Sequence, residues 1–209
     1  MTVFRLLNTA LSHAGLTGFR LDIAVALILA TGFCSIVILL GRLMDFLEDT
    51  LYSAISRLIS PKFALFTGNY LLFPGVMLHE LAHAIVASAT GGKVTKVKFF
   101  EVMGHGRLGQ VTFIPRGRRW QQLCQMAFSS CAPAVFGMAE VYALYTILTT
   151  ISLMPAARCL IIYLMTAIIC HASMSMEDLK HYLHGMFVVF PAVFTVFLAI
   201  QYFAVRMFT

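Results

Sequence analysis

Long apolar runs separated by short polar stretches are the main pattern of this chain. Leu21 to Gly41 contains about 20 residues, only one of them charged (Asp22), and this length is enough to cross a bilayer. Residues 43–62 then alternate apolar and charged positions at helical spacing. That alternation predicts an amphipathic helix at the membrane interface, ended by Pro61.

Further apolar segments follow, and each predicts another helix in the membrane. They are Phe63–Thr90, Gln122–Met154, Ala156–Met174 and Met186–Phe208. We expect Pro74-Gly75 to bend the first of them and Gly91-Gly92 to end it. The whole pattern predicts an all-α polytopic membrane protein with about five membrane segments, folded as a single domain over residues 1–209.

Residues 93–115 have a different spacing of apolar positions from the helical runs. Apolar residues recur at short intervals on both sides of Gly104-His105-Gly106, first from Val94 to Val102 and then from Leu108 to Phe113. This predicts a small β-hairpin that turns at these glycines. Because an open strand edge cannot face lipid, the hairpin must lie at the surface or line a protein cavity near the active site.

Composition and charge agree with a membrane protein. Hydrophobic residues make up 60% of the chain, charged residues 11%, and the mean hydropathy is +0.87, which lies outside the range of soluble domains. The net charge of +6 is concentrated before Trp120, where we find Lys93, Lys96, Lys98, Arg107, Arg116, Arg118 and Arg119. The positive-inside rule favours a cytoplasmic loop over a nucleic-acid interface, so we expect no nucleic-acid partner.

The pentapeptide His79-Glu80-Leu81-Ala82-His83 carries the candidate chemistry. Residues four apart share one face of a helix, so both imidazoles can bind one Zn²⁺ ion. Glu80 lies one step around the helix, where its carboxylate can act as a base on a metal-activated water. The residues on both sides of the motif are apolar, unlike those of a soluble metalloprotease helix, which indicates catalysis inside a bilayer.

A catalytic zinc site needs a third protein ligand. The candidates are Asp178, Glu177, Glu140, His171, His105 and Glu101. Asp178 and Glu177 fit best, because they follow an apolar segment at a helix break on the predicted cytoplasmic side. The alternative for Asp178 is that it caps the following helix together with Ser175. His171 could stabilise an oxyanion or orient a ligand, or its ring could simply bond to a neighbouring carbonyl.

These residues resemble the site-2 protease family of intramembrane zinc metalloproteases. The resemblance rests on Leu78–Ala84 and on Gly91–Phe99, where the family likewise ends its HExxH helix at a glycine and continues into strands. It implies that Ser130–Phe136 takes the place of the family's glycine–proline motif in the next span. It also implies that Asp178 is the third zinc ligand, although Leu179 follows it here instead of the family's glycine.

The sequence therefore predicts an intramembrane zinc endopeptidase that hydrolyses peptide bonds in or near membrane segments of membrane-protein substrates. His79, His83 and Asp178 would bind the metal, and Glu80 would be the catalytic base. A hairpin edge, either Val94–Phe99 or Gln110–Phe113, would hold the unwound substrate as an added strand. We expect a multi-pass protein of the bacterial inner membrane, with the lipid bilayer and its protein substrates as partners. The alternative is a non-catalytic metal-binding membrane protein, either a transporter or a pseudoprotease scaffold.

Overall fold

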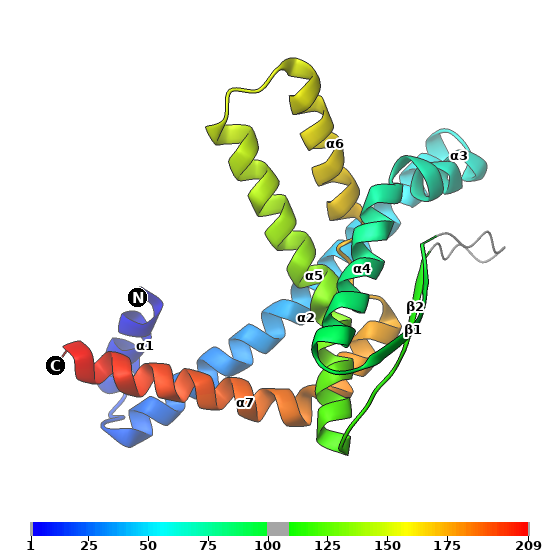
Figure 1. Cartoon of the computed structure of the whole chain (residues 1–209). Coiled ribbons are helices and arrows are strands. Elements are labelled where there is room, and N and C mark those ends of the chain that lie inside the picture. The colour runs from blue at the N-terminus through cyan, green and yellow to red at the C-terminus, as the bar shows by residue number, and fades with distance from the viewer. Residues whose placement is uncertain (1, 100–108, 209) are drawn as a thin grey trace. The chain divides into compact units, whose positions relative to one another are not determined.

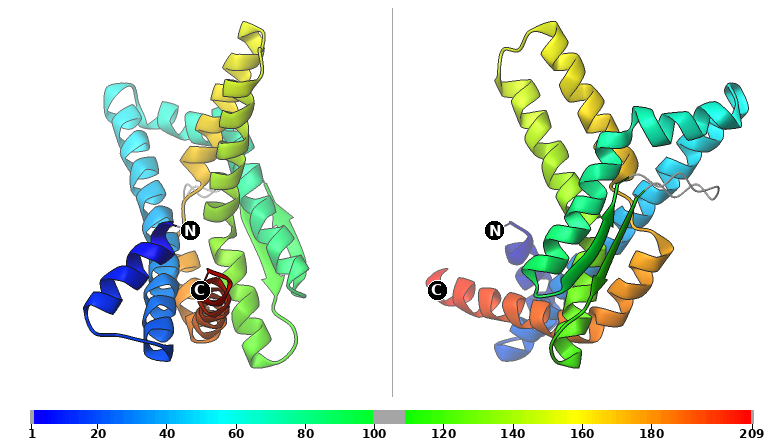
Figure 2. Two further views of the ribbon diagram at one scale, coloured as in Figure 1. Left: turned by 90° about the vertical axis from the view of Figure 1, so that its left-hand side faces the viewer. Right: turned by 45° about the vertical axis from the view of Figure 1, so that its right-hand side comes forward.

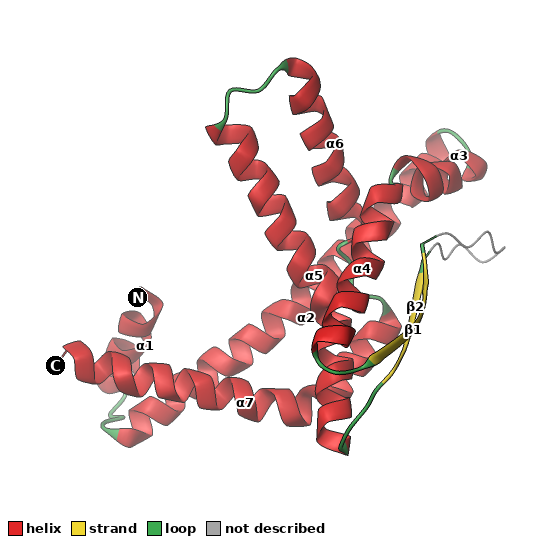
Figure 3. Cartoon of the chain, in the orientation of Figure 1, coloured by secondary structure: helices red, strands yellow, loops and turns green. Residues whose placement is uncertain are grey.

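The computed structural model describes residues 2–99 and 109–208, and these residues are mostly helical. Figures 1 and 3 show the helices and a two-stranded sheet. The elements are α1 (Thr2–His13), α2 (Phe19–Leu58), α3 (Pro61–Phe66), the π-helix η1 (Thr67–Leu71), α4 (Phe73–Ala89), β1 (Lys93–Lys98), β2 (Gln110–Ile114), α5 (Arg119–Thr150), α6 (Pro155–His171) and α7 (Met176–Phe208). The prediction of a helical protein with one small hairpin is confirmed.

The chain divides into two compact units. The first comprises Met1–Ile36 and Met186–Thr209, and the second comprises Val37–Gly185. Within the first unit, the fully buried Gln201 donates a hydrogen bond of 2.7 Å to the side-chain oxygen of Asn8. The HExxH motif and Asp178 both belong to the second unit, so that unit holds the whole candidate site.

Three helices of the described residues are long and apolar enough to cross a membrane. They are α2, α5 and the Met176–Phe203 part of α7. The sequence predicted about five such segments, but α4 and α6 have only 17 residues each. Large apolar side chains such as Leu39, Phe46 and Tyr142 are exposed on the outside of these helices, a pattern that suits a lipid environment.

The expected interfacial helix over residues 43–62 is not a separate element. α2 runs without a break from Phe19 to Leu58, because Gly41 alone does not end a helix and Arg42 pairs with Asp45 across 2.6 Å in the next turn. Pro61 starts α3 rather than ending a helix, since its missing N–H is no loss in a first turn.

The predicted helix over Phe63–Thr90 is divided into α3, η1 and α4, and Pro74 stands at the start of α4 instead of bending its middle. The predicted end of the helix is confirmed. Gly91 adopts a φ of 94°, which glycine accepts readily, and the amide of Gly92 donates to the carbonyl of Ala87 over 2.8 Å.

The hairpin is an antiparallel pair in which Val97 lies opposite Val111. It runs alongside α4 in both views of Figure 2. A register shift between Val94 and Lys96 marks a bulge. The predicted turn at Gly104-His105-Gly106 lies outside the described residues. The strands therefore follow directly from the helix that carries the HExxH motif and cover one side of it.

Close packing among α4, α5 and α6 depends on small residues. A side chain at Gly75 of α4 would place its Cβ 2.0 Å from the Ala167 carbonyl oxygen of α6. A Cβ at Gly137 of α5 would lie 2.7 Å from the Cβ of Ala172. Small residues let helix backbones approach closely in membranes. This approach brings Ser129 of α5 and the C-terminal end of α6 within reach of the two motif histidines.

Candidate metal centre

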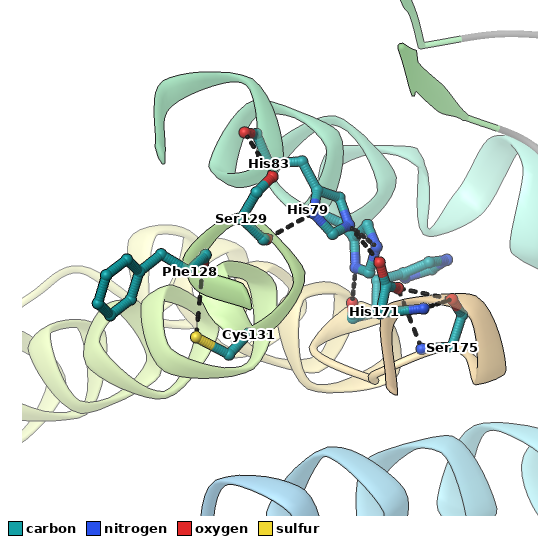
Figure 4. A network of polar contacts seen from close by, with 8 residues as sticks. His79, His83, Phe128, Ser129, Cys131, His171 and Ser175 are labelled. Carbon is teal, nitrogen blue, oxygen red and sulfur yellow. Dashed lines mark hydrogen bonds and ion pairs between the residues drawn. The ribbon is translucent and has the colours of Figure 1, made fainter. Parts of the chain in front are cut away.

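The two motif histidines face one another on α4. His79 and His83 are one helical turn apart, and their Nε2 atoms are separated by 3.1 Å. Figure 4 shows both rings directed toward the start of α7. The geometry thus brings both imidazoles to one point, as the i, i+4 spacing predicts.

The other ring nitrogen of each histidine is held by a backbone carbonyl. His79 Nδ1 lies 2.5 Å from the carbonyl oxygen of His171, and His83 Nδ1 lies 2.7 Å from that of Ser129. A carbonyl oxygen can only accept, so each Nδ1 carries the proton and each neutral Nε2 presents a lone pair. Two lone pairs directed at each other at this distance repel, unless a cation lies between them. The arrangement therefore fits a metal ion.

Both carbonyls can accept from a histidine ring because each lacks its usual amide donor within the helix. His171 is the last residue of α6, where helix carbonyls have no partner within the helix. Ser129 lies four residues before Pro133, which has no N–H to donate back to it. The Ser129 hydroxyl also donates to the His83 carbonyl over 3.1 Å, which fixes α5 against α4. The Ser130–Phe136 segment singled out by the family resemblance thus contains the proline that frees this carbonyl.

Asp178 completes a group of three potential ligands. Its Oδ1 lies 3.7 Å from His83 Nε2, and one ligand atom from each of His79, His83 and Asp178 falls within 4.8 Å of the others. A tetrahedral ion with bonds of about 2.0–2.1 Å places neighbouring ligand atoms about 3.3 Å apart. The separations of 3.1 Å and 3.7 Å lie on either side of that value. These three side chains could therefore hold a metal ion after a small adjustment.

Asp178 also caps α7, so the two roles considered for it are compatible. Its Oδ2 accepts from the Ser175 hydroxyl over 2.6 Å and from the Ser175 amide over 3.2 Å. In return, the Asp178 amide donates to the Ser175 hydroxyl over 3.1 Å, which completes a capping box. One carboxylate oxygen is thus used for the cap, and the other is left facing His83.

Glu80 lies beside the hairpin. Its side chain is buried, and the backbone amide of Val111 donates a hydrogen bond to its carboxylate. A Cβ at Gly109 would lie 2.4 Å from the Cγ of Glu80, so only glycine fits where the chain enters β2. β2 therefore covers and orients the expected catalytic base.

Three of the remaining candidates for the third ligand lie in the described part of the chain. Glu177 is exposed and is not among the three grouped ligands. Glu140 and His171 line a cavity of about 10 Å³ together with His79, which is room for roughly one water molecule. The His171 ring bonds to the carbonyl of Ala167 over 3.0 Å, while its own carbonyl holds His79. Glu101 and His105 lie outside the described residues.

Sequence reasoning missed the backbone carbonyls of Ser129 and His171. For Ser129 a signal was present, because a proline inside an apolar helix leaves the carbonyl four residues earlier without its usual donor. For His171 the signal was its place at the end of an apolar run.

Comparison of the chain with protein-family models, curated proteins and solved structures gave no match. Its function must be inferred from the site itself.

Replacing Pro133 with alanine tests the role of the free carbonyl. The restored amide would donate to Ser129 and compete with His83, so we expect metal affinity to fall by about tenfold, the usual effect of losing an outer-shell partner. Thermal stability should rise, because proline costs about 3 kcal/mol inside a helix. The matched control is Pro191→Ala in α7, which should raise stability without changing metal affinity. Equal metal affinity in both variants would contradict this explanation.

Proposed function

We propose that the protein is an intramembrane zinc endopeptidase acting on membrane-protein substrates. The observation that supports this most strongly is the pair of Nε2 lone pairs 3.1 Å apart, with one oxygen of Asp178 beside them and Glu80 as the next residue of the helix. Two imidazoles, a carboxylate and an adjacent second carboxylate form the donor set of a zinc hydrolase.

Each side chain then has a chemical role. His79, His83 and Asp178 would hold Zn²⁺, which when bound polarises the scissile carbonyl and makes the attacking water more acidic. Glu80 takes a proton from that water as the water oxygen bonds to the carbonyl carbon. Glu80 then gives the proton to the amide nitrogen as the carbon–nitrogen bond breaks. The Val111 amide keeps the Glu80 carboxylate in place for both transfers.

The hairpin is the proposed substrate-binding element. A substrate helix hides its carbonyls in its own hydrogen bonds, so a segment must unwind and find new partners before cleavage. Of the two hairpin edges considered from the sequence, we favour Gln110–Phe113 over Val94–Phe99. The contact from Val111 to Glu80 places β2 beside the expected base, where an added substrate strand would be within reach of it.

The metal content of purified protein tests the proposed site. We expect about one zinc ion per chain in the wild type, because two imidazoles and one carboxylate form an open tetrahedral site. His79→Ala and His83→Ala should each lose most of it by elemental analysis. If both variants kept a full complement of zinc, the histidine pair would not be a metal site, and the endopeptidase proposal would fail with it.

The placement in the membrane belongs to the same proposal. We place α2, α5 and α7 as full spans, with α4 and α6 as shorter segments that bring the total to five, in a bacterial inner membrane. The basic residues between Lys93 and Arg119 then lie in the cytoplasm. A single cysteine at Arg118, in a chain without the native cysteines, should react with an impermeant reagent only after the membrane is opened. Reaction in intact cells would reverse the orientation but not the metal site.

A further inference from the structure

One face of α2 bonds to the connector between α6 and α7, defined here as residues 171–175. Three residues of the helix take part, and their partners follow one another along the connector. The Tyr52 hydroxyl lies 3.5 Å from His171 Nε2, Glu48 Oε2 accepts from the Ser173 hydroxyl over 2.9 Å, and the Gly41 carbonyl accepts from the Met174 amide over 3.2 Å.

The spacing of these residues shows that they act as one surface. Positions 41, 48 and 52 are seven and four residues apart, so they share one face of the helix. Contact at Gly41 is close, because a Cβ there would lie 2.6 Å from the Cβ of Met174, and Met174 is fully buried. The connector therefore rests directly on the backbone of α2.

The connector carries two supports of the metal centre. At one end the His171 carbonyl holds the ring of His79, and at the other Ser175 holds the carboxylate of Asp178. Ser173 lies midway between them. Any side chain that fixes Ser173 therefore limits the movement of a ring and of a carboxylate that must converge on one ion.

Glu48 is well suited to this task. Its side chain is half-buried, and its carboxylate is bonded to the Ser173 hydroxyl on the connector. Its bond joins a helix outside the HExxH motif to the part of the chain that presents the third ligand. We infer that Glu48 is a positioning residue of the metal centre, which holds Asp178 and the His171 carbonyl in place through Ser173. This inference rests on the metal site of the proposed function.

Binding of Co²⁺ to the purified full-length protein tests this role, since the visible spectrum of the ion reports the geometry of its ligands. Glu48→Ala should weaken Co²⁺ binding by about tenfold and alter the spectrum. Glu48→Gln should restore both, because its amide oxygen can still accept from Ser173. Ser173→Ala should reproduce the loss. The matched control is Asp49→Asn, one residue further along α2, which should resemble the wild type.

These measurements distinguish failure of the positioning role of Glu48 from failure of the proposed function. If His79→Ala abolishes Co²⁺ binding while Glu48→Ala and Ser173→Ala keep the wild-type affinity and spectrum, the positioning role is overturned and the metal site stands. Failure of Glu48→Gln to restore the site would overturn the role of the Ser173 hydrogen bond. If Glu48→Ala does not fold, Ser173→Ala decides, because it removes only a hydroxyl. Absence of Co²⁺ binding in the wild type would overturn both proposals.

Discussion

Replacing Glu80 with glutamine is expected to leave the metal bound and to reduce peptide cleavage by about two to four orders of magnitude. Glutamine keeps the size and polarity of the side chain and can still accept from the Val111 amide, but it cannot take a proton from water. Purified wild-type and variant proteins should therefore have equal zinc contents and very different rates on a membrane-protein substrate. The equal zinc content is the control that separates lost chemistry from lost structure.

The rival functions predict other results for the same variant. A transporter would need His79 and His83 but would keep its activity without Glu80. A pseudoprotease would tolerate the loss of all three. Cleavage that persists at the wild-type rate in Glu80→Gln would contradict the mechanism proposed here, because Glu80 is the carboxylate that directly follows a ligand on the motif helix.

Replacing Asp178 with asparagine is expected to abolish both metal binding and cleavage without unfolding the site. The asparagine oxygen can still accept from Ser175 and keep the cap of α7. Its amide nitrogen then faces His83 in place of Oδ1, and an amide N–H₂ group has no lone pair to offer a metal. Elemental analysis should show loss of zinc, while thermal unfolding stays near that of the wild type.

Two companion variants sharpen this result. Asp178→Ala removes the carboxylate half of the capping box as well as the ligand, so it should also lose up to about 1 kcal/mol of stability. Glu177→Gln should be mild, because Glu177 is exposed and lies outside the ligand group. If zinc were lost in Glu177→Gln and kept in Asp178→Asn, the third ligand would be Glu177, and the position of the ligand would have to be revised.

The parts of the site that the sequence predicted are those governed by local spacing. The i, i+4 pair of His79 and His83 fixes two imidazoles on one helix face, and Gly91 ends that helix because it accepts a positive φ. The choice between ligand and cap for Asp178 could not be made from the sequence. A carboxylate has two oxygens, and only the three-dimensional arrangement shows that one meets Ser175 while the other meets His83.

The parts that the sequence did not predict depend on contacts between distant residues. The charges around Glu48 indicated an interfacial helix, whereas α2 continues through them and Glu48 meets Ser173 far along the chain. Periodicity alone cannot show which polar residue of a helix finds a buried partner. The same limit applies to Gly75, whose need for a small residue follows from the carbonyl of Ala167 on another helix.

Comparison of membranes that contain the wild type with membranes that contain Glu80→Gln tests the central claim most directly, since the two proteins differ only at the proposed base. Proteomic analysis should find membrane proteins cut in or near their membrane segments only where the wild type is present, with the uncut forms accumulating in the variant. Identical fragment patterns in the two membranes would contradict the conclusion that this chain is an endopeptidase.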